Sequence, residues 1–208
     1  MNIHRPSHPP ELITILDWIR YSISTFYQAG IFFGHGTDNE WDEASSLVFQ
    51  ALNLPLDMSA QRQEALYQAR VTETEKQHMA DWLQQRVELQ KPLPYITHQA
   101  WFAGMPFYVD ERVLIPRSPV AELILRGFKP YLSKEPKRIL DLCTGGGCIA
   151  IALANQFRES MVDAADIDSD ALDVASINIH EYQLEEQVIP LQSDLFSGLI
   201  GERYDLIV

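Results

Sequence analysis

A glycine-rich turn between two apolar segments carries the clearest chemical meaning in this sequence. The run RILDLCTGGGCIAIALA (138–154) begins as a short apolar strand, passes Asp141, and continues through Gly145–Gly147 into an alanine-rich helix. Consecutive glycines permit a tight turn and let a ligand approach the backbone closely. A turn of this kind at the carboxyl end of a strand is typical of sites for nucleotide-like ligands.

An acidic residue follows at a distance that fits such a site. Asp166 lies 21 positions after Gly145, at the end of the next apolar segment. A carboxylate in that position can accept two hydrogen bonds from a ribose diol. The alternative is one more charge in the acidic stretch 163–173. The place of Asp166 at a strand end favours the binding role.

Two further aspartates distinguish between ligand classes. Asp141 would repel a pyrophosphate and suits a cationic ligand or an ammonium group, although it can equally organise the loop through backbone N–H groups. Asp194, in the segment SDLF (193–196), can accept from the exocyclic amine of adenine while Leu195 packs on the base; a helix cap is the alternative. Together the aspartates favour S-adenosylmethionine.

Other residues with chemical potential are interpreted more simply. The two cysteines, Cys143 and Cys148, flank the turn without a histidine nearby, so small apolar packing is expected and no metal site is predicted. The six histidines show no ligand spacing, and no residue is predicted to be catalytic. The aromatic group that includes Phe102 is expected to be core, with a substrate groove as the alternative.

The elements that must position these residues fall into three stretches. Apolar periodicity and capping signals predict a small helical domain over 1–92, with helices at 11–29, from about 40, 60–68 and 73–90. Thr37 or Asp38 is expected to cap the second helix, and Thr72 with Glu75 the fourth. Aromatic and β-branched residues over 93–117 predict a β-hairpin linker.

The remainder, 118–208, alternates between helical and strand patterns. A helix is expected from Ser118–Pro119 to about Tyr131. Beyond it, strands are predicted at 137–142, 161–166, 187–191 and 204–208, with helices at 147–157 and 170–182. Such alternation predicts a parallel, doubly wound α/β sheet, here truncated after its fourth strand, which would leave that strand as an exposed edge.

Composition limits the possible partners. The chain has 208 residues, 46% of them hydrophobic, and a formal net charge of −13. No basic stretch is present to bind a phosphate backbone, so a basic protein or a cationic small molecule is the more compatible partner. Few cysteines and no long apolar run predict a protein of the reducing cytoplasm without a membrane span.

Several motifs together resemble the protein-glutamine N-methyltransferases. They are FGHGTDNEWDEA (33–44), YITHQAWFAGMPFYVDERVLIPRSPVAELI (95–124), DLCTGGGCIAIA (141–152), DIDSDALDVASINI (166–179) and SDLF (193–196). The resemblance is closest to the branch that methylates a glutamine in the third protein of the large ribosomal subunit. A sister branch, which acts on translation release factors, resembles the chain in the glycine loop and VLIPR, but much less in the helical domain.

The resemblance implies a Rossmann-like class I methyltransferase fold with S-adenosylmethionine as cofactor. It assigns Asp166 to the ribose, and Asp194 and Leu195 to the adenine neighbourhood. It places Leu114–Arg117 at the interdomain cleft. The residues expected to bind substrate are Arg117, from this segment, and Phe102, from the aromatic group. The loop around the methionine part of the cofactor is expected to comprise Cys143, Thr144, Gly145, Gly146 and Gly147.

The sequence departs from the family pattern at two places. Gly146 stands where the family usually has serine or threonine, which predicts weakened cofactor contacts but not a lost site. The Asn-Pro-Pro-Tyr motif that follows the family's fourth strand is absent from the 208 residues. We therefore expect this form alone to transfer no methyl group.

The implied activity is methylation of a glutamine side-chain amide in a basic ribosomal protein, without direct binding of nucleic acid or membrane. Alternatives within the class are a release-factor methyltransferase and another amino-methyltransferase, including one acting on nucleic acid. Outside it, a nicotinamide-dependent oxidoreductase and a non-catalytic cofactor-binding module remain open. A pyrophosphate-binding loop would favour the oxidoreductase, and Asp141 and Asp194 weigh against it.

Overall fold

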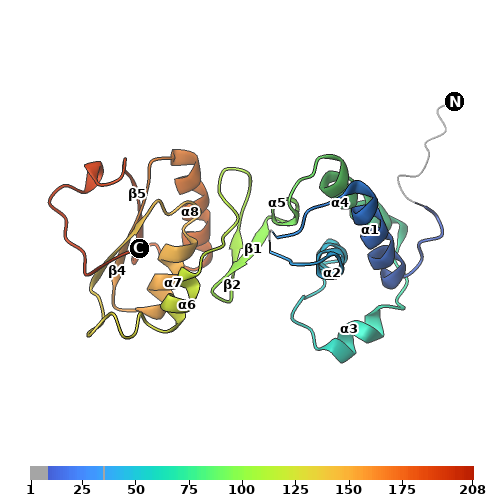
Figure 1. The fold of residues 1–208 in the computed structure, drawn as a ribbon, viewed down its shortest axis with the longest axis horizontal. Coiled ribbons are helices and arrows are strands. Elements are labelled where there is room, and N and C mark those ends of the chain that lie inside the picture. Colours follow the sequence, from blue (N-terminus) through green and yellow to red (C-terminus); the bar gives the residue numbers. More distant parts are fainter. Residues whose placement is uncertain (1–8, 35) are drawn as a thin grey trace. The chain divides into compact units, whose positions relative to one another are not determined.

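The computed structural model describes residues 9–34 and 36–208 (Figure 1). It divides into two compact units, Met1–Thr97 and His98–Val208. The region predicted as a hairpin linker contributes to both, because its first residues form a short helix of the first unit and its strands belong to the second. In the part of the chain that is described, no helix is both long and apolar enough to span a bilayer.

The first unit is helical, as predicted. It contains α1 (Ile15–Ala29), α2 (Glu40–Ala51), α3 (Ala60–Leu66), α4 (Glu73–Glu88) and α5 (Leu93–Thr97). Helix α1 begins four residues later than predicted because Thr14 is its N-cap, in a capping box with Asp17. The predicted capping box of Thr72 and Glu75 at α4 is confirmed.

The cap predicted for α2 was wrong by one or two residues. Asn39 is the N-cap, since its side-chain oxygen accepts from the main-chain N–H of Asp42 at 2.9 Å. Thr37 has a different partner: its hydroxyl donates to Oε2 of Glu43 at 2.7 Å. Threonine and asparagine are both good capping residues, so residue type alone does not distinguish them. The Thr37 hydroxyl bonds to Glu43 and is therefore not the cap.

A buried ion pair joins α2 to α4. Glu43 and Arg86 are 3% and 4% exposed, and Nε of Arg86 donates to Oε1 of Glu43. Nη2 of Arg86 also donates to the main-chain oxygen of Phe32 at 2.9 Å. Because Thr37 holds the other carboxylate oxygen, this pair fixes the segment that precedes α2.

The second unit begins with an antiparallel hairpin, β1 (Gln99–Phe102) and β2 (Met105–Tyr108). Helix α6 follows at Val120–Leu125 and is shorter than predicted. Gly127 and Phe128 both adopt left-handed backbone angles, with φ of 62° and 54°, and so end the helix well before Tyr131. Its N-cap is Pro119, and Ser118 lies one residue earlier.

A four-stranded parallel sheet forms the centre of this unit. Its strands are β3 (Arg138–Leu142), β4 (Met161–Asp166), β5 (Val188–Gln192) and β6 (Leu206–Ile207), in the order β5-β4-β3-β6. The predicted parallel α/β fold is confirmed. The chain moves outward from β3 to β5 and then returns to the other side of β3 for β6. The carboxyl end of β3 is therefore a topological switch point, where ligands bind in folds of this kind.

Alternate residues of each strand serve the two faces of the sheet. Ile139, Val162 and Val188 join the larger core with α6, α7 (Cys148–Gln156) and α8 (Ser169–Glu181), which also includes Phe102 and Phe107 of the hairpin. Leu140 faces the other way, toward Leu199 in the short 3₁₀ helix η1 (Ser197–Leu199). The hairpin core therefore belongs to the same unit as the glycine turn.

The buried pair of the first unit yields a stability prediction. Arg86→Met leaves the Glu43 carboxylate buried without its cation, so we expect the free energy of unfolding to fall by about 3–5 kcal/mol. Urea denaturation monitored by tryptophan fluorescence measures it. The exposed Arg62, replaced by methionine in the same way, is the control. Equal losses for both variants would contradict the role given to the pair.

Candidate functional site

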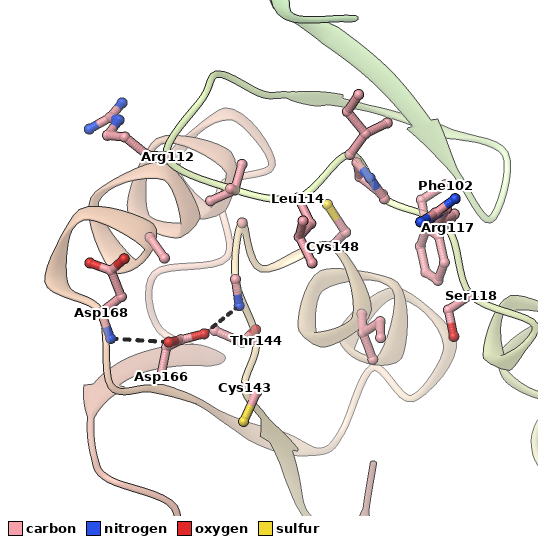
Figure 2. A pocket seen from close by; sticks show the side chains of 17 residues that line it. Phe102, Arg112, Leu114, Arg117, Ser118, Cys143, Thr144, Cys148, Asp166 and Asp168 are labelled. Carbon is pink, nitrogen blue, oxygen red and sulfur yellow. Dashed lines mark hydrogen bonds between the residues drawn. The ribbon is translucent and has the colours of Figure 1, made fainter. Parts of the chain in front are cut away.

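A pocket of about 520 Å³ opens at the switch point beyond β3 (Figure 2). Its residues all belong to the second unit: Phe102, Arg112–Ser118, Cys143–Gly146, Cys148, Ile149, Asp166, Asp168 and Ala171. The pocket is of the size that small ligands and cofactors occupy. Strand ends, the glycine turn and the segment after the hairpin thus form one site.

The glycine turn has the geometry that the sequence predicted. Gly145 and Gly147 have φ of 54° and 79°, in the left-handed region. A Cβ at Gly147 would also come within 3.2 Å of the Ala175 side chain, whereas one at Gly145 would meet nothing within 4 Å. The turn is therefore packed against α8 on one side and open on the other.

Gly146 is constrained less than its neighbours. A Cβ there would lie 3.5 Å from Val174 and 3.6 Å from Val113, which is ordinary contact. The position therefore has room for the Cβ of the serine or threonine that the family usually carries. That the missing hydroxyl weakens contacts with the cofactor stays a prediction.

Asp166 lies at the pocket as predicted, at the end of β4. Its Oδ2 accepts from the main-chain N–H of Gly145 at 2.8 Å, and its Oδ1 accepts from that of Asp168 at 3.1 Å (Figure 2). Each carboxylate oxygen has a further lone pair available to a ligand hydroxyl. The carboxylate therefore joins the glycine turn to β4 and still lines the pocket.

Asp141 takes the loop-organising position. It is 2% exposed and is not part of the pocket lining. Its Oδ2 accepts from the Thr144 hydroxyl at 2.5 Å and from the Ala150 main-chain N–H at 3.0 Å. Burial raises its pKa to about 6, against the opposing effect of these two hydrogen bonds. A direct contact of Asp141 with a ligand ammonium group stays a prediction.

The two cysteines differ in environment. Cys148 is buried in α7, and burial raises the pKa of its thiol to about 12, so it packs as an apolar residue, as predicted. For Cys143 the packing prediction was wrong, because it is exposed, has φ of 63° and lines the pocket. Among the described residues, no group of three or more possible metal ligands is found.

The adenine-side residues are not brought into the lining. Asp194 and Leu195 lie after β5, and Leu195 is 56% exposed with φ of 49°. The capping alternative for Asp194 is not what the structure shows, since the N-cap of η1 is Phe196. Ser193 holds this turn instead: its hydroxyl donates to the Leu195 carbonyl at 2.7 Å and accepts from the Gly198 N–H at 2.9 Å.

Both residues predicted to bind substrate lie at the pocket. Phe102 lines it while being only 5% exposed, so it serves the core as well. Arg117 also lines the pocket, and it is exposed. The sequence prediction missed Arg112 and Asp168. Asp168 could have been found as an N-cap signal, because it precedes the helical pattern of α8 and accepts from Asp170 N at 2.9 Å.

Comparison with known proteins finds that the glycine turn and Asp166 lie in a region similar to a methyltransferase domain. Residues 121–208 match the family model "Methyltransferase small domain". The chain is 46% identical over 200 residues to "Ribosomal protein uL3 glutamine methyltransferase" of Neisseria meningitidis, in a serogroup A and a serogroup B strain, covering 95% of this chain. The resemblance predicted from the motifs is thereby confirmed.

The chain spans 64% of the length of these two relatives. Among solved structures, the ribosomal protein L11 methylase of Lactobacillus delbrueckii subsp. bulgaricus aligns with a TM-score of 0.39 and 21% identity. That alignment covers 48% of this chain and 49% of the other. A likeness at this level carries no argument about function.

Burial of Asp141 predicts a pH-dependent stability. The pKa of about 6 in the folded protein lies above the ordinary 3.8, so the folded state binds the proton more tightly than the unfolded state does. This contribution is fully present below pH 3.8 and is lost as pH rises through about 6, and it amounts to about 3 kcal/mol. Asp141→Asn, which cannot titrate, removes it.

Urea denaturation of both proteins at intervals from about pH 4 to pH 7 measures the effect. We expect the wild type to lose stability relative to Asp141→Asn as pH rises. The exposed Asp173, replaced by asparagine, serves as control. Parallel stability curves for wild type and Asp141→Asn would show that the carboxyl titrates normally.

Proposed function

We propose that this chain, whose residues 121–208 match the family model of a methyltransferase domain, binds S-adenosylmethionine and serves the methylation of a glutamine side-chain amide in ribosomal protein uL3. The single observation that carries the first half is the pocket at the switch point, which contains both the glycine turn and Asp166. The relatives' name and the 46% identity support the second half.

The pocket residues fit the parts of this cofactor. The free lone pairs of the Asp166 carboxylate suit the two ribose hydroxyls. The loop Cys143–Gly146 offers its backbone, and the open side at Gly145 gives room for the methionine part. Asp194 and Leu195 are proposed for the adenine end, which lies beyond the lining residues. The proposed role of Asp141 is to hold the turn from beneath through Thr144 and Ala150.

The bound cofactor would supply an electrophilic methyl group on a sulfonium. An amide nitrogen is a poor nucleophile, because its lone pair is delocalised into the carbonyl. The protein must therefore fix the amide in line with the departing sulfur and accept its hydrogens. In that process this chain holds the methyl donor. The resemblance assigns binding of the substrate amide to an Asn-Pro-Pro-Tyr motif that is not among these residues.

The acceptor side is proposed to be the wall formed by Phe102 and Leu114–Arg117. Leu114 is 89% exposed there, which makes it available to a polypeptide substrate. The chain's net charge of −13 is compatible with a basic ribosomal protein. We propose that the protein acts in the cytoplasm on this protein, without direct contact to nucleic acid or membrane.

Cofactor binding is tested by isothermal titration calorimetry with S-adenosylmethionine. Asp166→Ala removes two hydrogen bonds to a charged acceptor, so we expect affinity to fall by about 100-fold or more. Asp173→Asn, on the exposed face of α8, should bind as the wild type does. Unchanged affinity in Asp166→Ala would contradict the ribose assignment, and tighter binding of NAD than of S-adenosylmethionine by the wild type would favour an oxidoreductase.

The substrate is tested by binding of purified uL3 and of a release factor to the chain, measured by fluorescence anisotropy. We expect uL3 to bind more tightly, and the reverse order would favour the release-factor alternative.

A further inference from the structure

Asn178 is a buried polar side chain that does not line the pocket and yet touches its framework. It lies on α8 and is 1% exposed. Its apolar neighbours on the same helix face are Val174, Ala175 and Ile179, all buried. A polar group in such a position is unfavourable unless its hydrogen bonds are made, and their partners show what it does.

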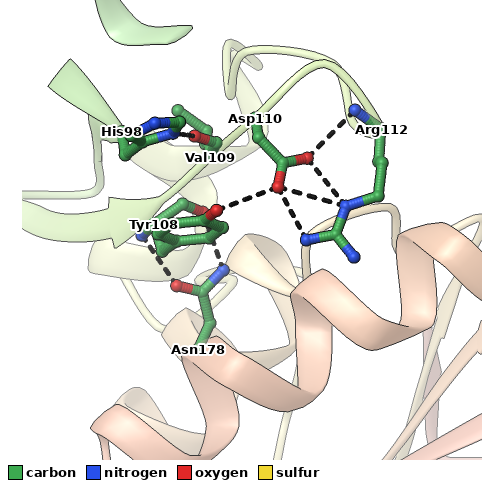
Figure 3. Close-up of polar contacts among 6 residues, drawn as sticks. All are labelled: His98, Tyr108, Val109, Asp110, Arg112 and Asn178. Atoms are coloured by element: carbon green, nitrogen blue, oxygen red, sulfur yellow. Dashed lines mark hydrogen bonds and ion pairs between the residues drawn. The ribbon is translucent and has the colours of Figure 1, made fainter. Parts of the chain in front are cut away.

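The amide of Asn178 bonds to two separate segments. Its Oδ1 accepts from the main-chain N–H of Tyr108 at 2.8 Å, and its Nδ2 donates to the Tyr108 carbonyl at 3.1 Å (Figure 3). The same Nδ2 donates to the carbonyl of Gly146 at 2.8 Å. One side chain therefore holds the end of β2 and the glycine turn at a fixed spacing.

The hairpin end held in this way leads directly into the pocket wall. The Tyr108 hydroxyl donates to Asp110 at 3.0 Å, and the Arg112 guanidinium donates to both oxygens of the same carboxylate (Figure 3). The guanidinium holds the pKa of Asp110 well below its usual range. Arg112 and the adjacent Val113 both line the pocket.

We propose that Asn178 is a positioning residue for the methyl donor, which sets the distance between the glycine turn and the wall that begins at Arg112. This inference rests on the proposed function, since the donor is the ligand it concerns. A pocket whose walls are fixed before binding loses less freedom when the ligand enters. Replacing Asn178 should therefore lower donor affinity by more than the loss of stability explains.

The test compares affinity with stability in four variants of the full chain. Asn178→Ala removes all three hydrogen bonds, and Asn178→Asp places a carboxylate oxygen against the carbonyls of Tyr108 and Gly146. Val188→Ala is a matched destabilising control, buried in β5, and Ser176→Ala is an exposed control on α8. Melting temperature and calorimetric affinity for S-adenosylmethionine are measured for each, at a temperature where all are folded.

We expect both Asn178 variants to bind the donor about tenfold or more weakly than Val188→Ala of similar melting temperature. We expect Ser176→Ala to match the wild type in both measurements. If the Asn178 variants retain affinity within twofold of Val188→Ala, the residue is only structural and the proposal is overturned.

Hydrogen exchange without any ligand separates this proposal from the proposed function. Asn178→Ala should speed exchange at the Tyr108 amide and also at the Gly145 and Gly147 amides. Val188→Ala should leave the exchange rates of the two glycine amides unchanged relative to the rate of the Tyr108 amide. A wild type that binds no donor would overturn the proposed function, and the exchange data would still decide whether Asn178 holds the turn. Unchanged exchange at both glycines would overturn that role.

Discussion

The register between β3 and β4 is the constraint on which the rest of the site depends. Parallel pairing places Leu142 opposite Ala165, so the two strands end at the same edge of the sheet. The turn after β3 then bonds directly to its neighbour, because the Thr144 N–H donates to the Ala165 carbonyl at 2.9 Å. A shift by one residue would move Asp166 away from Gly145 and turn the alternating side chains of β4 to the wrong faces.

Around this edge, the turn is held from three directions by polar groups that differ in exposure. Asp141 bonds to it from the buried side, Asp166 from the neighbouring strand and Asn178 from α8. Only Asp166 also lines the pocket. The two buried groups are costly to desolvate and are stabilised only by complete hydrogen bonding. The loop is thus fixed by the fold and keeps its open side for a ligand.

Much of this arrangement could be predicted from the sequence, because it depends on local pattern. Strand periodicity, the glycine turn and the spacing to Asp166 are all local. The direction of a side chain depends on tertiary packing and not on local pattern. Two roles therefore stayed open for Asp141, and the buried environment predicted for Cys143 was wrong. Asn178 did leave a signal: it stands at the helical spacing of the buried residues Ala171, Val174 and Ala175. A polar residue at a core position of a helix indicates a specific partner.

The unequal burial of the two cysteines has a practical consequence. Both cysteines line the pocket, but Cys148 is buried and keeps its proton, with a thiol pKa of about 12, whereas Cys143 is exposed. Thiol reagents attack the thiolate and need access, so alkylation of the native chain is confined to one of its two thiols. The molecule thereby carries a built-in attachment point for a fluorophore or spin label, whose signal would report occupancy without an engineered residue.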